Sequence, residues 1–376
     1  MSDTAILTTH PKPSLGAGRL SLIVGALAAI GLVTVFAGAR FGMMLAIGLG
    51  FGIALEGLRF GFAGPWRAMI VRRDPAGILA QLLSIALVAI VAIPLLASHP
   101  QELTGAQAPI GLAMIGGAFI FGAAMQVVMG CGSGTLVNAG SGNPVGLLAL
   151  PFFAIGSFGG AYHLIWWTDL GSLPILTLTG MSGLLVTLAA LALVAGILLV
   201  LAKPGTRRIP RRLLVAAVAL AVLAVANLVV AGQPWGVVYG LGLWVAKGTV
   251  AMGGDLSGSP FWSAAGSIQR VQSSILTDYT SLTNIGLIAG AFGVASWRRG
   301  GLDQPLPKYP VRGWIAAIIA GLLLGYSSRL AFGCNVGAFF SGIATGSLHG
   351  WVWFAAAFAG AFLGIRLRRV AGLETS

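Results

Sequence analysis

The chain has 376 residues, of which 57% are hydrophobic and 8% charged, and its formal net charge is +13. A soluble protein of this length carries roughly 25% charged residues, so the composition excludes a water-exposed surface and requires a lipid bilayer as the solvent. The basic residues sit in short loops between apolar stretches, as the positive-inside rule expects, and we therefore expect no nucleic-acid partner.

The apolar stretches predict an all-α polytopic membrane protein with about nine transmembrane helices, since each crossing needs about 20 mostly apolar residues. A polar tail of 19 residues comes first. The apolar run that follows it is longer than the core of a signal peptide, about 7–15 residues, which favours a first span over a cleaved signal. The predicted spans are 20–38, 77–97, 110–128, 145–165, 174–201, 212–231, 281–297, 312–330 and 348–366.

Two further apolar regions, 41–70 and 236–275, are interrupted by glycine, proline and charged residues. Irregular backbone at membrane depth survives only where protein or a water-filled cavity covers it. We therefore predict that each region forms a pair of short re-entrant half-helices at the centre of the bundle, where the substrate path of a transporter commonly lies.

Four clusters of lysine and arginine decide the predicted orientation in the membrane. They lie at 72–73, 203–212, 298–312 and 366–369. All four fit on the cytoplasmic side if each of the two interrupted regions enters and leaves the membrane on the same face. This arrangement predicts a multi-pass protein of the bacterial inner membrane with its amino terminus outside and its carboxy terminus inside.

The sequence contains an internal repeat. The segment around Gly-Cys131-Gly-Ser-Gly resembles the one around Gly-Cys334-Asn-Val-Gly, 203 residues later. Five predicted spans separate the two cysteines, and an odd number inverts the second half relative to the first. Inverted repeats with broken helices are typical of transporters, although a gene duplication without a transport role is the alternative. The predicted division is a polar tail at 1–19, repeat 1 at 20–166, a connecting span and basic loop at 167–211, repeat 2 at 212–370 and a tail at 371–376.

Cys131 and Cys334 are the only cysteines, which excludes a disulfide framework and a four-cysteine metal site. We expect no metal and no cofactor. Each cysteine ends an apolar helix and begins a turn rich in glycine and serine, whose free backbone N–H groups suit an anion. A buried cysteine is more often an inert small hydrophobe, and a disulfide between the two is another alternative. Their equivalent repeat positions nevertheless favour a translocation role, shared by the neighbouring Gly130, Gly132, Gly134, Gly333, Asn335 and Gly337.

Ionisable residues inside membrane segments are costly and point to function. Glu56 and Arg59 lie in the first interrupted region and Lys247 in the second, while Arg329 precedes Cys334 by five residues. The repeat counterpart of Arg329 is Gln126, so only one cysteine would have a fixed positive charge beside it. The alternatives are an internal pair of Glu56 with Arg59 and an Arg329 side chain that extends to the lipid–water interface.

Two runs resemble the signatures of YeeE/YedE-type sulfur-transport proteins. The run from Arg329 through Gly-Cys334-Asn-Val-Gly to Trp351 is similar to the carboxy-terminal signature, and Met129-Gly-Cys131-Gly-Ser-Gly to the first-half motif. The resemblance covers essentially the full membrane portion. It implies an hourglass-shaped uptake protein with nine spans and extra short central helices, in which cysteines, here Cys131 and Cys334, pass thiosulfate inward.

The resemblance has one departure. The family commonly carries a third cysteine in a pattern like Arg-Phe-Cys-Phe, and here the stretch reads Arg59-Phe-Gly61-Phe. Gly61 therefore marks a relay position without its thiol, which implies that two cysteines suffice or that the substrate differs. Some relatives also carry a soluble sulfur-carrier domain. This chain ends soon after its last span, so we expect any such carrier to be a separate cytoplasmic protein.

These observations predict a transporter, and not an enzyme, that moves a small sulfur-containing anion. Thiosulfate is the leading substrate and a selenium compound the alternative. No phosphate-binding loop for ATP occurs in the sequence. The rival function is a membrane thiol–disulfide electron carrier, which would require the two cysteines to cycle between dithiol and disulfide. A scaffold without transport activity is the third reading.

Overall fold

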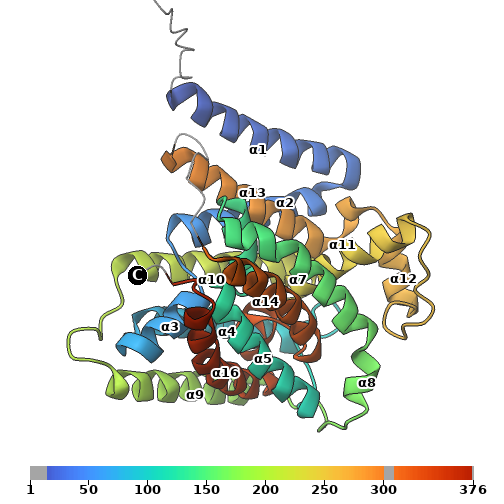
Figure 1. Cartoon of the computed structure of the whole chain (residues 1–376). Helices are drawn as coiled ribbons and strands as arrows, with labels where there is room; N and C mark the ends of the chain where they lie inside the picture. The colour runs from blue at the N-terminus through green and yellow to red at the C-terminus, as the bar shows by residue number, and fades with distance from the viewer. Residues whose placement is uncertain (1–14, 300–308, 375–376) are drawn as a thin grey trace, which may run out of the picture.

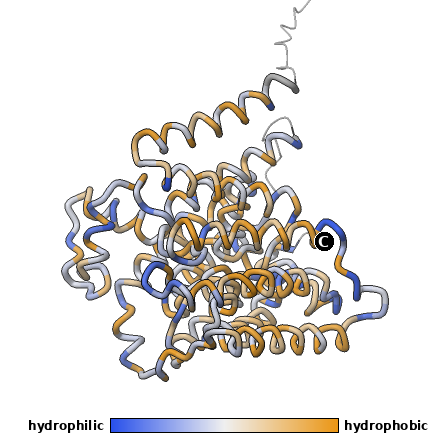
Figure 2. The backbone as a smooth tube through the Cα atoms, turned by 180° about the vertical axis from the view of Figure 1, so that it is seen from behind, coloured by the Kyte–Doolittle hydropathy of each residue, from blue (hydrophilic) through white to orange (hydrophobic). Residues whose placement is uncertain are grey.

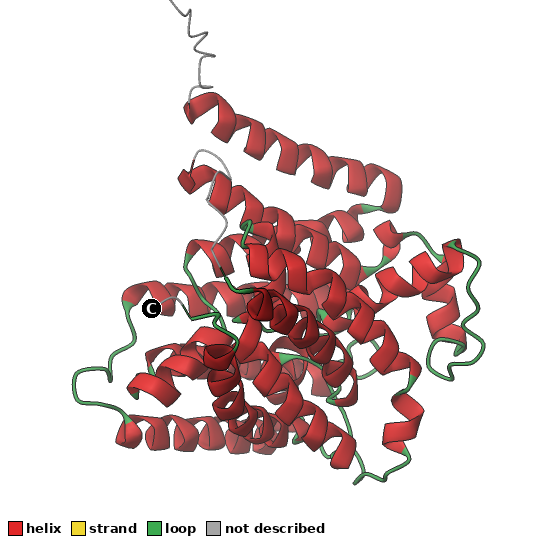
Figure 3. Ribbon diagram, viewed as in Figure 1, coloured by secondary structure: helices red, strands yellow, loops and turns green. Residues whose placement is uncertain are grey.

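The computed structural model describes residues 15–299 and 309–374, and these residues form helices and connecting loops without a strand (Figure 3). Nine of the described helices are long and apolar enough to cross a membrane, which confirms the predicted all-α membrane protein. Seven of them are α1 (Leu15–Ala37), α2 (Ala39–Gly57), α4 (Ala76–Ser98), α7 (Pro144–Tyr162), α9 (Gly180–Leu201), α10 (Arg211–Ala231) and α16 (His349–Val370). The other two are the run Leu112–Gly140, which starts with α5 (Leu112–Val128), and the run Val311–Ala344, which starts with α14 (Val311–Leu330).

The remaining elements are one long helix and several short ones. The long helix, α13 (Tyr279–Arg299), coincides with the predicted span 281–297, but its first turns carry Thr280, Ser281, Thr283 and Asn284, which lower its hydropathy. The short elements are α3 (Ala63–Arg72), α6 (Gly132–Gly140), α8 (Leu164–Thr168), α11 (Val238–Ala251), α12 (Ala265–Gln272), η1 (Ile275–Thr277), η2 (Asn335–Phe340) and α15 (Ser341–Ala344).

The region 41–70 differs from the predicted pair of half-helices. α2 is a full-length helix of 19 residues, and only α3 is short. The break lies between them, where Arg59 has a left-handed backbone conformation (φ 49°). The glycine, proline and charged residues that suggested a broken span therefore lie at or after the end of α2 and not at its middle. The other region, 236–275, does form the two short helices α11 and α12.

The full crossing of α2 changes the side on which the chain begins. Arg19, near the start of α1, lies over the ring of Trp297 near the end of α13, with Cζ 4.8 Å from the ring centroid. Trp297 directly precedes Arg298 of a basic cluster, so α1 starts at the same end of the bundle as that cluster (Figure 1). The prediction that places the amino-terminal side opposite the basic clusters is wrong, because it counted α2 and α3 as a pair that returns to one face.

The basic clusters meet at one end of the molecule, called the basic end. It comprises the loops at 57–62, 72–75 and 202–210 together with the last turns of α13 and α16. The Lys203 N–H donates to the Arg73 carbonyl (3.0 Å). Arg67 on α3 pairs with Glu374 beyond α16, and this hydrogen-bonded contact lowers the pKa of the Glu374 carboxyl. The loops 99–111, 163–179 and 252–278 form the opposite, far end, and the helices between the two ends are predominantly apolar (Figure 2).

Glycine pairs four residues apart let the long helices pack backbone to backbone. On α13, a Cβ at Gly286 or Gly290 would lie 2.5 or 2.3 Å from a backbone carbonyl of α2. On α14, a Cβ at Gly321 or Gly325 would meet the α7 backbone at 2.7 or 2.1 Å. Small residues at this spacing drive helix association in lipid, where the hydrophobic effect does not act between helices.

Packing partners occur in reciprocal pairs. α2 packs on α13 as α10 packs on α4, and α7 packs on α14 as α16 packs on α5. At the centre, α11 packs on α7 as α3 packs on α16, while α5 contacts α14 directly. The segments α2–α7 and α10–α16 thus form two like halves, with α3 matching α11, and with α1 and α9 at the periphery (Figure 1). The inversion of one half and the predicted domain boundaries stay predictions.

Aromatic side chains fill the interior between the halves. Phe51 of α2 stacks on Trp235, just before α11, with ring centroids 3.8 Å apart. Trp66 of α3 contacts Phe339 of η2 and Trp353 of α16 at 5.9 and 6.3 Å. These fully buried rings hold the short helices of each half against the other half.

Candidate functional site

The two Gly-Cys motifs have similar backbone geometry. A residue with a left-handed conformation follows each helix, Met129 (φ 57°) directly after α5 and Phe332 (φ 56°) two residues after the end of α14. This conformation costs a non-glycine residue about 1–2 kcal/mol and is retained mainly at functional turns. Cys131 and Cys334 follow after one glycine, both extended, with φ and ψ of −79° and −163° and of −90° and −170°. Each cysteine carbonyl accepts a 2.8 Å hydrogen bond from the N–H four residues later, so each thiol stands at the first turn of a short helix.

Both thiols are buried and free. Cys131 is 1% exposed and Cys334 is 0% exposed, and neither takes part in a disulfide. The Cys131 sulfur accepts a hydrogen bond from the Gly134 N–H (3.4 Å) and lies 3.4 Å from the Ser133 hydroxyl. Contacts to sulfur of this kind are weak, so a ligand with a soft atom can replace them at little cost.

A cavity of about 330 Å³ adjoins Cys131 and lies toward the basic end. A side chain at Gly61 or Gly64 on its wall would meet no atom within 4 Å. Glu56 pairs with Arg298 across 3.7 Å, so an acidic and a basic group flank the break before α3. The lining residues are Leu55, Glu56, Arg59, Phe60, Gly61, Phe62, Ala63, Gly64, Pro65, Met129, Gly130, Cys131, Ser133, Gly134, Val137 and Asn138.

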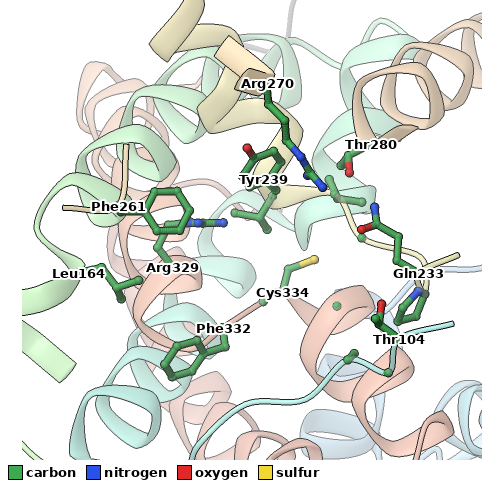
Figure 4. Close-up of a pocket in the computed structure, with 18 residues that line it drawn as sticks. Thr104, Leu164, Gln233, Tyr239, Phe261, Arg270, Thr280, Arg329, Phe332 and Cys334 are labelled. Atoms are coloured by element: carbon green, nitrogen blue, oxygen red, sulfur yellow. The ribbon is translucent and has the colours of Figure 1, made fainter. Parts of the chain in front are cut away.

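A second cavity, of about 440 Å³, adjoins Cys334 and lies toward the far end. Figure 4 shows the Cys334 sulfur pointing into the space between Tyr239, Gln233 and Thr104. The lining residues are Thr104, Gly105, Ala106, Leu164, Gln233, Pro234, Gly236, Val237, Val238, Tyr239, Phe261, Arg270, Thr280, Arg329, Phe332, Gly333, Cys334 and Gly337.

Two arginines give the Cys334 cavity its charge. Cζ of Arg329 lies 4.7 Å from the ring centroid of Phe261 and 5.7 Å from that of Tyr239, and Cζ of Arg270 lies 5.0 Å from the Tyr239 centroid. In the part of the chain that the structure describes, neither arginine forms an ion pair. Cation–π contacts hold the two guanidinium groups in place and leave N–H donors for an anion. The cavity therefore favours a negatively charged ligand.

The two cavities approach each other at a contact called the waist, made by Cys131, Gly132, Cys334 and Asn335. A Cβ on Gly132 would lie 2.6 Å from the Cys334 sulfur and 3.1 Å from its Cβ, so no larger residue leaves Cys334 in its position. α6, which begins at Gly132, packs on η2, which begins at Asn335. Gly132 is thus bonded to Cys131 and, at the same time, lies against the thiol of Cys334.

The structure separates the predicted site residues into two groups. Ten predicted residues line one of the two cavities: Cys131, Cys334, Gly130, Gly134, Gly333, Gly337, Arg329, Glu56, Arg59 and Gly61. Two more, Gly132 and Asn335, belong to the waist. Lys247 lines neither cavity: its Nζ donates to the carbonyls of Arg270, Val271 (2.9 Å) and Ser273 at the end of α12. Gln126 lines neither cavity either, and its amide donates to the Ala63 carbonyl (3.0 Å).

Sequence reasoning missed two buried amides that hold the breaks before the short helices. Gln81 on α4 donates to the Gly61 carbonyl (2.8 Å), and Asn284 on α13 donates to the Val237 carbonyl (2.8 Å). Both side chains are 0% exposed, and they lie 203 residues apart, the same offset as the two cysteines. That shared offset is the signal in the sequence that could have found them. Tyr239 and Phe261, also missed, carry no comparable signal.

The sequence is similar to those of known transport proteins. Residues 58–363 match the Sulphur transport family. The Thiosulfate transporter TsuA of Spirochaeta thermophila is 26% identical over 339 residues, which is 82% of this chain and 93% of that protein. The Probable transporter YedE of Escherichia coli is 35% identical over 99 residues, 26% of this chain, and that of Salmonella typhimurium 32% over 97 residues. In both YedE proteins the match spans about a quarter (24%) of their length.

The family match covers both cysteine motifs, most of the described helices and all residues that line the two cavities except Leu55 and Glu56. This chain belongs to the Sulphur transport family.

Proposed function

We propose that this chain takes up a small sulfur-containing anion, thiosulfate in first place, through the Cys334 cavity at the far end and the Cys131 cavity at the basic end. One observation carries the proposal: each cavity is lined by one buried free thiol, and the Cys334 sulfur lies against Gly132, the neighbour of Cys131. The basic end is the predicted cytoplasmic side of a bacterial inner membrane, so the path runs inward.

The chemistry of the cavities suits thiosulfate. Its oxygen atoms carry negative charge, for which Arg270 and Arg329 supply donors at the Cys334 cavity. Its terminal sulfur is soft and polarizable, and a thiol is the side chain that can contact it without strong binding. Weak contacts matter here because a transported ligand must leave each site as readily as it reaches it. The relative that matches over most of the chain is named a thiosulfate transporter.

The path has three stages. The anion first meets the two arginines, which offset part of the cost of removing its water. It then passes the Cys334 thiol, crosses the waist and reaches the Cys131 thiol near the first turn of α6. Backbone N–H groups of that turn provide the next donors. At the basic end, Arg59 borders the cavity, where a separate cytoplasmic sulfur carrier would accept the product.

Uptake of ³⁵S-thiosulfate into cells without their own uptake systems tests the proposal. Cys131→Ser and Cys334→Ser each replace a soft contact by a harder hydroxyl of similar size. We expect each to lower uptake by about tenfold, equivalent to about 1.4 kcal/mol, with unchanged protein level in the membrane. Equal uptake by the wild type and the double serine variant would remove the thiols from the mechanism.

The same assay separates transport from electron transfer. An electron carrier needs its two thiols to cycle through a disulfide, and a selenium transporter would prefer a selenium analogue. Uptake that persists with excess membrane-permeant thiol reductant, and that a selenium analogue inhibits no better than unlabelled thiosulfate, supports the proposal. Loss of uptake under reduction would support the electron carrier instead.

A further inference from the structure

We infer that the Asn335 side chain selects the substrate at the waist, by donating its amide N–H groups to the oxygen atoms of an anion that passes between the two thiols. This inference rests on the proposed function and adds to it a residue that tells sulfur oxyanions from sulfur anions without oxygen.

The first observation is an unsatisfied amide in the interior. Asn335 is 0% exposed, yet neither Nδ2 nor Oδ1 has a hydrogen-bond partner among the described residues. Leaving both ends of a buried amide unpaired is unfavourable, and such groups in native proteins commonly mark sites where a ligand or water binds. Asn335 directly follows Cys334, so its side chain lies within one residue of a thiol of the proposed path.

The second observation concerns the position of the side chain. Asn335 and Gly132 occupy the same position in the two motifs, one residue after a cysteine with an extended backbone. A side chain on Gly132 would point at the Cys334 sulfur, 2.6 Å away. Because α6, which begins at Gly132, packs on η2, which begins at Asn335, the Asn335 side chain starts at the contact between the two motifs.

The asymmetry between the two positions has a physical consequence. Gly132 brings no side chain to the waist, whereas Asn335 brings a carboxamide. A carboxamide offers two N–H donors and no net charge. It can therefore replace the water of a sulfonate-type oxygen without trapping the anion as an arginine would. A polysulfide has no oxygen to accept these bonds, so it loses its water without compensation.

Proteoliposomes with the full chain and ³⁵S-thiosulfate test this role. Asn335→Leu removes the N–H donors and keeps a side chain of similar size. We expect the KM for thiosulfate to rise by about tenfold, the effect typical of losing a hydrogen bond to an ionised group, and kcat to change less. We also expect unlabelled polysulfide to inhibit thiosulfate uptake better, relative to unlabelled thiosulfate, in this variant than in the wild type.

Asn335→Asp provides a signature that a structural role would not give. The introduced carboxyl repels the anion when ionised and donates one O–H when protonated. Uptake by the variant, divided by wild-type uptake at each pH, is therefore expected to fall as the pH rises from 6 to 8.5. The titratable groups on the packed elements, Cys131, Cys334 and His349, are present in both proteins and cancel in this ratio.

Asn143→Asp serves as the matched control. Asn143 is exposed at the start of α7, where its Oδ1 accepts from the N–H groups of Val145 (3.0 Å) and Gly146 (3.1 Å). An aspartate caps a helix equally well, so this variant should transport like the wild type at every pH.

The outcomes separate the inference from the function beneath it. No thiosulfate uptake by wild-type proteoliposomes would overturn the proposed function. Wild-type uptake combined with unchanged KM, inhibition pattern and pH ratio in the Asn335 variants would overturn only the role of Asn335. If Asn335→Leu lowers thiosulfate uptake without changing the KM or the inhibition pattern, the amide has a structural role only. That result would also overturn the proposed role of Asn335.

Discussion

At the scale of single residues, Gly132 is the position where one methyl group should matter most. In Gly132→Ala the new Cβ would lie 2.6 Å from the Cys334 sulfur, so the thiol must leave its position in the waist. Overpacking of this kind costs about 1–3 kcal/mol, and we expect thiosulfate uptake to fall by about tenfold. The measurement is initial uptake rate, normalised to the protein in the membrane.

Two other glycines make this prediction specific. In Gly134→Ala the Cβ would meet the Cys131 sulfur at 3.6 Å, an ordinary contact, so the loss should be smaller. Gly116, exposed on α5, has no atom within 4 Å of a built Cβ, and its alanine variant should transport like the wild type. Similar rates in Gly132→Ala and Gly116→Ala would show that the waist tolerates a side chain.

Among the predicted site residues, most of those tied to the repeat line the two cavities. The Gly-Cys motifs occur in the same register, and their shared chemistry marks both thiols as candidates from the sequence alone. Lys247, by contrast, lines neither cavity. A cation inside an apolar region suggested a substrate contact, but the last carbonyls of α12 lack partners within their helix, and the three ammonium donors satisfy them. Such a contact between neighbouring elements leaves no pattern in one sequence.

At the scale of elements, hydropathy predicted most spans because the lipid imposes length and composition on each crossing. It failed at 41–70, where a complete helix and a short one follow without a polar loop. The average over such a region looks like one broken span, although the break lies beyond Gly57. Hydropathy also predicted the apolar span 281–297, although the amino-terminal turns of the corresponding helix, α13, are polar. These polar turns face the interior of the bundle, where Asn284 and Ser281 are 0% exposed.

The contact between α13 and α2 yields a prediction at this scale. In Gly290→Ala the new Cβ would lie 2.3 Å from the Leu49 carbonyl, so the two helices must separate. We expect a loss of about 1–3 kcal/mol in stability, seen as a lower apparent Tm of the detergent-solubilised protein. Gly293→Ala, one turn further on the same helix, has no atom within 4 Å of its Cβ and is the control. An equal Tm for the two variants would contradict close packing of α2 on α13.

At the scale of the whole molecule, the reciprocal packing of the two halves explains why the protein has two cavities of similar construction. Each half contributes a break before a short helix, a buried amide that holds the break, and a cysteine at the first turn of another short helix. The halves differ in their charged groups. Arg270 and Arg329 line the far cavity, whereas Arg59 and Glu56 line the basic cavity, and Glu56 pairs with Arg298. Under the proposed function, an anion would meet the two far arginines before it reaches the end of the molecule where the basic clusters lie.

Direction depends on which end faces the cytoplasm, and single-cysteine labelling can decide it. In the Cys131→Ser/Cys334→Ser background, Gly18→Cys probes the start of α1, Arg208→Cys the basic end and Gly266→Cys the far end, all at exposed positions. Since the start of α1 lies beside the basic clusters, we expect a membrane-impermeant thiol reagent to label only Gly266→Cys in intact spheroplasts. Gly18→Cys and Arg208→Cys should react only after the membrane is permeabilised. Labelling of Gly18→Cys from outside would restore the outer amino terminus, and labelling of Arg208→Cys from outside would reverse the proposed path, because the two arginines would then face the cytoplasm.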